Sequence, residues 1–252
     1  MKRIAFLLSL AVLLAAVCGA GAEPLKLGED LADTITVEYD EGNPEAGRYV
    51  YSYRYPHVDE SDPAAPLVNA FYDYLVSDTL AFGLPMDSEY YQEIGLSVTR
   101  EVSYEITCNS DEYFAVLVEN RETLEGASHS TWTGHSFSRQ SGTPGSTATL
   151  PQLLNILATD ENDTWLQDRQ TERADQLLRS MVWAKMQENE AGVEYYPDLT
   201  EEDLEGFFFP EEDFYLDETG NPVFYLEPGA AAPESFGLLH FPISLEEIKD
   251  EM

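Results

Sequence analysis

The sequence predicts an α+β fold in which antiparallel sheets are packed by helices and form two closely associated subdomains. Several short segments alternate polar and apolar residues, which is typical of half-buried strands. Segments 66–82 and 164–188 instead repeat apolar residues at helical spacing. Turn residues separate the alternating segments at the short distances that hairpins need. Packing an amphipathic helix on a sheet is a common way to bury both apolar surfaces.

The first part of the chain is expected to form strands at 34–39 and 48–57, followed by the helix at 66–82. Four tyrosines of the second strand fall on one face of an extended chain, namely Tyr49, Tyr51, Tyr53 and Tyr55. Such a ladder can stack on sugar rings. We favour a half-buried sheet surface covered by the helix that follows. Gly83-Leu84-Pro85 is expected to end that helix.

A β-hairpin is predicted in the middle of the chain. Segments 96–107 and 113–120 alternate on either side of the turn Asn109-Ser110-Asp111. Phe114, Val116 and Val118 share the face that we expect to point inward. Segment 129–138 is expected to add one more strand.

The last part of the chain is predicted to mix helices with a closing hairpin. The expected elements are a helix at 150–157, the long helix at 164–188, hairpin strands at 214–217 and 223–226, and a strand at 236–243. The long helix is expected to bury an apolar stripe that begins at Trp165 and Leu166 and ends at Met186. Ser244 and Glu247 have the spacing of a capping box for a terminal helix.

Residues 1–22 have the three parts of a secretory signal peptide. Lys2 and Arg3 give a positive start, 4–17 is an apolar run, and Ala20-Gly21-Ala22 matches a cleavage site. The apolar run has about 14 residues, fewer than the ~20 that span a bilayer, so we favour cleavage over a retained membrane helix. No later segment is apolar enough to span a membrane. We therefore expect an extracytoplasmic protein, either secreted or associated with the cell envelope.

The predicted parts of the chain are a signal peptide at 1–22, an N-terminal subdomain at 23–110 and a C-terminal subdomain at 111–252. Cys18 leaves with the signal peptide, so Cys108 stands alone and no internal disulfide is expected. A lipid anchor at Cys18 is disfavoured, because Val17 precedes it where such sites have a small residue. Cys108 is expected to be a small buried apolar residue, since no nearby cation would lower its pKa.

The expected mature chain is strongly acidic. Loss of Lys2 and Arg3 leaves 11 basic residues against 48 acidic ones, a formal charge of −37. Such a surface repels nucleic acid and anionic lipid, so we exclude both as partners. It attracts cationic proteins, peptides or metal ions. An equally simple interpretation is solubility outside the cell, because net charge acts on solubility and association rate.

No motif in the sequence assigns a catalytic residue, a metal ion or a cofactor. His129 and His135 would share a strand face, but ~20 Å apart, too far for one metal ion. The segment Gly134-His135-Ser136-Phe137-Ser138 lacks the last glycine of a nucleophile elbow, and we treat it as chance. None of the acidic clusters has the spacing of an EF-hand.

Several loose motifs, taken in order, resemble a known family. They are Tyr55-Pro56-His57 with Asn69, Gly126-Ala127-Ser128-His129, Thr149-Leu150-Pro151-Gln152-Leu153-Leu154, the hairpin at 214–226, and 237–243. Together they resemble an exported bacterial domain pair of unassigned function. This pair occurs in the extracellular parts of anti-sigma-V-type factors and before the catalytic domain of some peptidoglycan deacetylases. The resemblance covers about Thr34 to Ile248.

The resemblance implies antiparallel sheets packed by helices and a place outside the cytoplasmic membrane. In the anti-sigma subgroup, the domain pair recognises lysozyme-type muramidases. This chain departs from that subgroup because it has no sigma-binding segment, no retained membrane helix and no deacetylase domain. Ser128 also stands where a small apolar residue is usual. The regulatory role therefore does not transfer, whereas binding of an envelope component does as an expectation.

Two hypotheses from different functional classes follow. The favoured one is a non-catalytic binding module of the bacterial cell envelope that recognises a protein, such as a cationic muramidase, or a cell-wall glycan. The alternative is an envelope hydrolase acting on peptidoglycan or peptide, with His129 beside a carboxylate. The loop at 229–235 is part of the expected binding surface. The candidate binding residues are Tyr55, His57, His129, His135 and Tyr225.

Overall fold

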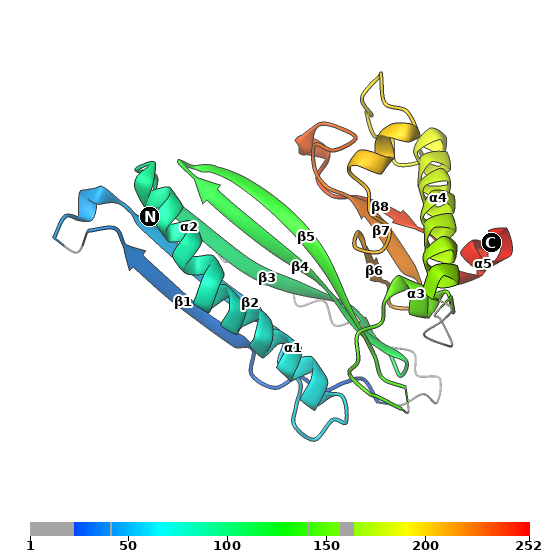
Figure 1. Cartoon of the computed structure of the whole chain (residues 1–252), viewed down its shortest axis with the longest axis horizontal. Helices are drawn as coiled ribbons and strands as arrows, with labels where there is room; N and C mark the ends of the chain where they lie inside the picture. Colours follow the sequence, from blue (N-terminus) through cyan, green and yellow to red (C-terminus); the bar gives the residue numbers. More distant parts are fainter. Residues whose placement is uncertain (1–22, 41, 141, 157–163) are drawn as a thin grey trace, which may run out of the picture.

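The predicted α+β class is confirmed. The computed structural model describes residues 23–40, 42–140, 142–156 and 164–252, and the expected signal peptide with Cys18 lies outside these ranges. A five-stranded mixed sheet and a three-stranded antiparallel sheet are packed by helices (Figure 1). Within the described ranges, no helix is both long enough and apolar enough to cross a bilayer.

The larger sheet has the strand order β1–β2–β3–β4–β5. Its strands are β1 (Leu31–Glu38), β2 (Arg48–Tyr55), β3 (Val98–Asn109), β4 (Tyr113–Leu124) and β5 (Ala127–Ser138). Neighbouring strands are antiparallel except β2 and β3, which run parallel. A parallel pair needs a crossover connection. Helices α1 (Ala65–Asp78) and α2 (Leu84–Glu93) supply it, which makes this sheet mixed.

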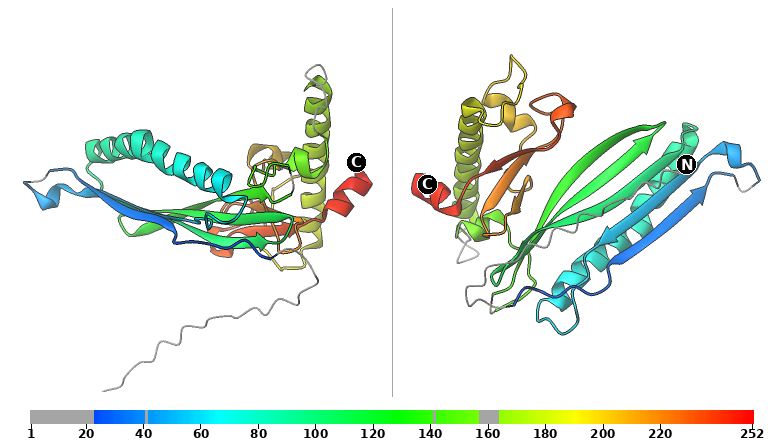
Figure 2. Two further views of the ribbon diagram at one scale, coloured as in Figure 1. Left: turned by 90° about the horizontal axis from the view of Figure 1, so that it is seen from below. Right: turned by 180° about the vertical axis from the view of Figure 1, so that it is seen from behind.

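Helices α1 and α2 cover one face of the larger sheet (Figure 2). The four tyrosines of β2 point to this face, and each is at most 8% exposed. The ring of Tyr55 stacks on the ring of Tyr72 in α1, with centroids 5.2 Å apart. Val68 and Val76 of the same helix are buried in the same core. The packing interpretation of the tyrosine ladder is therefore confirmed.

The helix does not end at Gly83, and that prediction is wrong. Residues Thr79–Gly83 form a π turn that joins α1 to α2, and the amide of Leu84 donates to the carbonyl of Thr79. Proline lacks an N–H and clashes with the preceding turn inside a regular α-helix. Pro85 instead lies in the first turn of α2, directly after the wider π turn. A proline is tolerated in a first helical turn, so the helix continues.

Strands β3 and β4 form the predicted hairpin, and their two faces enter different cores. Phe114 and Val116 pack in the N-terminal core with the tyrosines. Cys108 and Ala115 point to the other side and join the C-terminal core. Cys108 is 1% exposed and burial raises the pKa of its thiol, so the expected buried apolar cysteine is confirmed. The expected boundary at 110–111 lies in this hairpin's turn, so strands from both sides of it share one sheet.

The smaller sheet has the strand order β6–β7–β8 and packs against α4 (Thr164–Glu188), whose bounds match the prediction. Its strands are β6 (Phe214–Leu216), β7 (Pro222–Leu226) and β8 (Leu239–Pro242). Leu178, Val182 and Met186 of α4 are buried, whereas Trp165 and Leu166 are exposed. The predicted apolar stripe is therefore wrong at its start and correct at these three buried positions.

Short helices complete the C-terminal part. Helix α5 (Leu245–Glu251) begins at the predicted capping box, where Ser244 and Glu247 each accept from the other's backbone N–H. The late strand starts three residues later than expected, because Glu234–Phe236 forms a 3₁₀ turn. The remaining short elements are α3 (Leu150–Leu153) and 3₁₀ turns at Pro44–Ala46 and Glu202–Gly206.

The two sheets meet where β5 passes β6 and β7. A Cβ atom on Gly134 would lie 1.8 Å from the carbonyl oxygen of Phe214, so only glycine allows this approach of two backbones. The hydroxyl of Tyr225 donates to the carbonyl of Trp132 at 3.0 Å. The amide of Trp132 donates to Glu227 Oε1 at 2.9 Å. Close packing and hydrogen bonds therefore fix the smaller sheet on one end of the larger one.

Candidate functional site

The five candidate binding residues do not form one site. Tyr55 and His135 lie in the N-terminal core on either side of Tyr72, whose ring centroid is 5.2 Å from that of Tyr55 and 5.7 Å from that of His135. Tyr225 is buried at the contact between the two sheets, and burial raises the pKa of its phenol. These three side chains have structural contacts, and a role in ligand binding stays a prediction for each of them.

His57 and His129 lie at the surface but far apart along the sheet. His57 lines a shallow hollow with Gly28 and Asp59, close to the start of β1. His129 is exposed on β5, opposite Glu122 of β4. In the described part of the chain, His129 has no hydrogen bond to a carboxylate. The arrangement expected of a hydrolase centred on His129 is therefore not present among these residues.

The family-like motif around Tyr55 and Asn69 has a structural explanation. Asn69 in α1 is 8% exposed. Its side-chain oxygen accepts from the amide of Val58 at 2.8 Å, and its side-chain nitrogen donates to the carbonyl of Val58 at 2.9 Å. Asn69 thereby satisfies both backbone groups of a buried loop residue, which would otherwise be costly to leave unpaired. This contact fixes the loop between β2 and α1.

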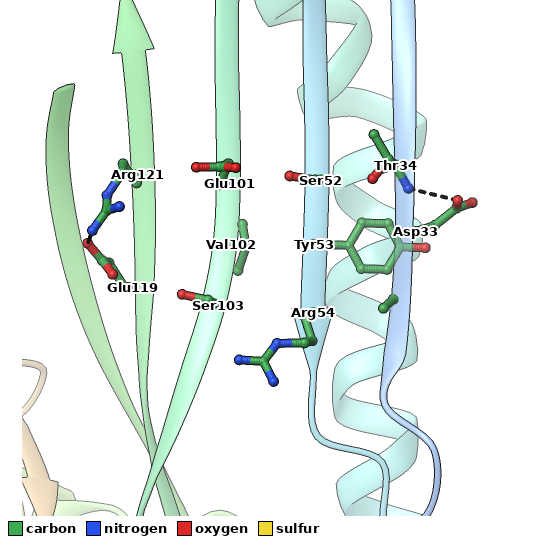
Figure 3. A pocket seen from close by; sticks show the side chains of 11 residues that line it. Asp33, Thr34, Ser52, Tyr53, Arg54, Glu101, Val102, Ser103, Glu119 and Arg121 are labelled. Carbon is green, nitrogen blue, oxygen red and sulfur yellow. Dashed lines mark hydrogen bonds and ion pairs between the residues drawn. The ribbon is translucent and has the colours of Figure 1, made fainter. Parts of the chain in front are cut away.

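The face of the larger sheet opposite the helices carries a continuous row of polar side chains. Strand register places these side chains next to one another across all five strands. We call them the polar row: Thr34, Ser52, Glu101, Arg121 and Ser130. Figure 3 shows four of them side by side on neighbouring strands. With strands about 4.8 Å apart, the row is about 19 Å long.

A network of hydrogen bonds holds one end of the polar row. Arg121 Nη2 donates to Glu119 Oε1 at 2.8 Å, and Ser130 Oγ donates to the same oxygen at 2.7 Å (Figure 3 shows the first contact). Glu119 lies next to Ser103 and Trp132 in the sheet register. The guanidinium is therefore oriented along the open face instead of moving freely in solvent.

The middle of the row has polar side chains without partners among the described residues. Among the described residues, Glu101, Ser52 and Ser103 have no side-chain hydrogen bond or ion pair. Their carboxylate and hydroxyl groups line a shallow hollow that continues to Arg54 and Thr34. Acceptors, hydroxyls and a guanidinium on a flat surface suit a hydrogen-bonding ligand more than an apolar one.

A second group of polar contacts lies where β1 begins. Arg54 Nη1 is 3.4 Å from Asp30 Oδ2, and its guanidinium lies 5.1 Å from the ring centroid of Tyr104. The hydroxyl of Tyr104 donates to Asp30 Oδ1 at 2.7 Å. Burial, and secondarily Asp30, raises the pKa of Tyr104. Arg54 thus has its charge balanced locally while half of its side chain is exposed.

The described residues contain no cluster of side chains that could bind a metal ion. Among them, no group of three or more His, Cys, Asp or Glu side chains is close enough to hold an ion. Burial lowers the pKa of the His135 imidazole to about 4. Its Nδ1 atom is buried and has no hydrogen-bond partner among the described residues. A neutral ring among aromatic neighbours is a packing residue rather than a ligand for a metal ion.

The polar row was not among the sequence-based candidates, although part of its signal is local. Ser52 with Arg54, Glu101 with Ser103, and Glu119 with Arg121 are each two residues apart, as residues on one strand face are. The alternation therefore indicates a polar face for each strand separately. It does not give the register that aligns the five strands, which depends on pairing between segments far apart in the sequence.

Comparison with known proteins gives a likeness of fold. No family model matches the sequence, and no curated protein matches it. The structure is similar to that of a DUF3298-family member from Bacteroides fragilis, with a TM-score of 0.53 and 14% identity over 90% of this chain and 94% of the other. A DUF3298-family protein from Pseudomonas aeruginosa gives a TM-score of 0.48 and 12% identity over 90% and 93%. At such identities the likeness concerns the fold alone.

Proposed function

We propose that this chain is an exported module of the bacterial cell envelope that binds its ligand on the open face of the larger sheet and does not transform it. The ligand is a cell-wall glycan or an envelope protein. The observation that carries this proposal is the polar row, which presents hydrogen-bonding groups from all five strands on a face that none of the described helices covers.

Two features support a place outside the cytoplasm. Residues 1–22 have the composition of a secretory signal peptide. The motif order resembles the exported domain pair of anti-sigma-V-type factors and deacetylases. A module of this kind would act where cell-wall polymers and secreted proteins are its neighbours.

The chemistry of the row fits a glycan. Sugar hydroxyls and acetamido groups donate and accept hydrogen bonds, and the row offers the carboxylate of Glu101, the guanidinium of Arg121 and several hydroxyls. A row about 19 Å long accommodates an extended polymer lying across the strands.

The acidic surface also supports a protein ligand. The formal charge of −37 for the expected mature chain would steer a cationic protein toward it and raise the association rate. A cationic muramidase is the protein that the family resemblance suggests. Its binding should weaken steeply as the salt concentration rises, since surface charges are screened.

Calorimetric titration of the mature chain at low salt tests the proposal. The two probes are soluble peptidoglycan fragments and a cationic muramidase. Glu101→Gln removes a charge from the polar row with little change of shape, and Arg121→Gln removes the guanidinium that pairs with Glu119. Glu101→Gln should weaken binding of either ligand by about tenfold or more, and Arg121→Gln should do so for a glycan. Glu172→Gln, an exposed site on α4, is the matched control and should bind normally.

Two results would overturn the proposal. One is the absence of binding to both probes at low salt. The other is release of soluble products from peptidoglycan or peptide by the wild-type chain, with the release abolished by one substitution. The second result would favour the envelope hydrolase instead.

A further inference from the structure

The outer surface of the α1–α2 helix carries large apolar side chains in solvent. Tyr74, Phe82, Met86 and Tyr90 are 67%, 65%, 70% and 57% exposed. We call these four the apolar stripe. Single exposed apolar residues are common on protein surfaces, whereas a contiguous group marks an interaction site.

The π turn aligns the stripe. In an unbroken α-helix, eight residues turn about 80° past two full turns, so Phe82 would be offset from Tyr74. The π turn at Thr79–Gly83 takes up one additional residue, which leaves the two side chains about 20° apart. Met86 and Tyr90 follow at intervals of four residues. All four therefore lie within an arc of about 80°.

The stripe lies on the far side of the helix from the sheet. Val68, Tyr72 and Val76 face the core and are nearly inaccessible to solvent. Figure 2 shows this helix as the outer layer on its face of the sheet. The polar row lies on the opposite face of the same sheet, so the two surfaces are separate.

The stripe is set among negative charges. The helical stretch 65–93 contains five acidic residues and no Lys or Arg. Asp87 is bound to Arg100, with Arg100 Nη1 at 2.8 Å from its Oδ2. Asp78, Glu89 and Glu93 are exposed and form no ion pair with any described residue. Helical geometry places these three within or beside the arc of the stripe.

Exposed apolar side chains together with unpaired carboxylates favour one kind of partner for the apolar stripe. A second copy of the chain would bring like charges together on two identical stripes, which is unfavourable. An anionic membrane would be repelled by the same carboxylates. A partner that carries Lys and Arg among large apolar side chains satisfies both the charges and the apolar area. Aromatic rings also attract ammonium and guanidinium groups.

We propose that the apolar stripe docks a cationic amphipathic helix of a partner protein. The partner helix lies along α1–α2 and packs its apolar residues between Tyr74, Phe82, Met86 and Tyr90, as side-chain ridges pack into grooves. Its Lys and Arg side chains reach Asp78, Glu89 and Glu93. This surface goes beyond the proposed function of the polar row and does not depend on it.

Fluorescence anisotropy with the mature full-length chain tests this proposal. The probe is a labelled synthetic helix of Lys and Leu in which Leu recurs at positions i, i+3 and i+4. Two control peptides have the same length: one replaces every Lys by Glu, and the other scrambles the order of Lys and Leu. We expect the first peptide to bind at low salt, the scrambled one at least about tenfold more weakly, and the acidic one not at all.

Paired variants locate the binding surface. Phe82→Ala with Met86→Ala, and separately Glu89→Gln with Glu93→Gln, should each weaken binding of the amphipathic peptide by about tenfold. Trp165→Ala removes an equally exposed aromatic side chain from α4 and should leave binding unchanged. Circular dichroism checks that each variant keeps its helix.

Several outcomes would overturn the proposal. They are equal binding by all variants, equal binding of the scrambled peptide, and binding to vesicles of zwitterionic or anionic lipid that the Phe82→Ala and Met86→Ala pair abolishes. Concentration-dependent dimerisation lost in that pair would assign the stripe to self-association and would also overturn it. Glu101→Gln should leave peptide binding intact, so a failure here is distinguishable from a failure of the polar row.

Discussion

The two faces of the larger sheet come from the same five strands but differ in burial and polarity. On one face, the tyrosines of β2 form an aromatic core under α1. On the other, Ser52 of the same strand is half-buried and Arg54 is exposed. The difference teaches that the crossover helix decides which face is core, because it must pass over one side of the parallel pair β2–β3. Stability should therefore depend on one face and ligand binding on the other.

Tyr72→Ala should have the largest effect on this contrast. Tyr72 is 1% exposed and contacts the rings of Tyr55, Phe71 and Phe137. Removing a buried aromatic ring costs about 3–5 kcal/mol of unfolding free energy, measured by denaturant unfolding. Tyr72→Phe is the control. The hydroxyl is buried without a partner among the described residues, so its removal should cost little or should stabilise. A large loss in Tyr72→Phe would contradict this structure of the core.

Acid should lower the free energy of unfolding through His135. Burial lowers the pKa of this imidazole to about 4, below the value of about 6.5 expected in the unfolded chain. The unfolded state then binds a proton that the native state does not. Stability is fully present above pH 6.5 and falls by up to about 3 kcal/mol as the pH drops toward 4.

A single variant isolates that contribution to pH dependence. Two carboxyls, Asp175 and Asp213, have pKa values raised by burial to about 6, and they act in the opposite direction because their native forms bind protons more readily. Subtracting the unfolding free energy of His135→Leu from that of the wild type at each pH cancels them. The difference should change between pH 6.5 and 4, and a difference that stays constant over this range would contradict the role of His135.

Asn69→Ala should cost about 2 kcal/mol. It removes two hydrogen bonds to Val58 and leaves a buried amide and carbonyl unpaired. Asn69→Asp loses the donor and places a buried carboxylate beside the carbonyl of Val58, so at neutral pH it should be at least as destabilising as the alanine variant. An alanine variant as stable as the wild type would mean that water replaces the side chain there.

Glu101→Gln should have the smallest effect on stability, within about 0.5 kcal/mol, because the side chain is exposed and has no partner among the described residues. The same variant should lower ligand affinity, as proposed above. Thermal unfolding and titration of one sample measure both quantities. A stability loss above 1 kcal/mol with unchanged affinity would remove the distinction between the two faces.

Local patterns in the sequence account for much of the fold. The alternation in β2 predicts its buried tyrosines, the spacing in 164–188 predicts α4, and Ser244 with Glu247 predicts the start of α5. The π turn is missed because Gly-Leu-Pro normally ends a helix. The parallel pairing of β2 with β3 is missed because the sequence does not give the order of strands in a sheet.

The candidate site was less accessible to sequence reasoning. The five residues chosen for their side-chain type include two that support the core around Tyr72 and one that joins the sheets. The polar row instead consists of ordinary residues such as Ser52 and Glu101, which gain meaning only through cross-strand register. Selection by residue type therefore found side chains that pack in the structure. The polar row could be recognised only from the pairing of strands that are far apart in the sequence.

The hairpin of β3 and β4 has a consequence for protein engineering. Phe114 and Cys108 lie on opposite faces of this hairpin and pack in different cores. If the protein were divided, whichever part lacked the hairpin would lose residues from its core. The smaller sheet has three short strands and cannot be expected to persist in isolation. We therefore expect that any engineered version of this protein, such as a chimera or a split reporter, must keep the chain from β1 to α5 together.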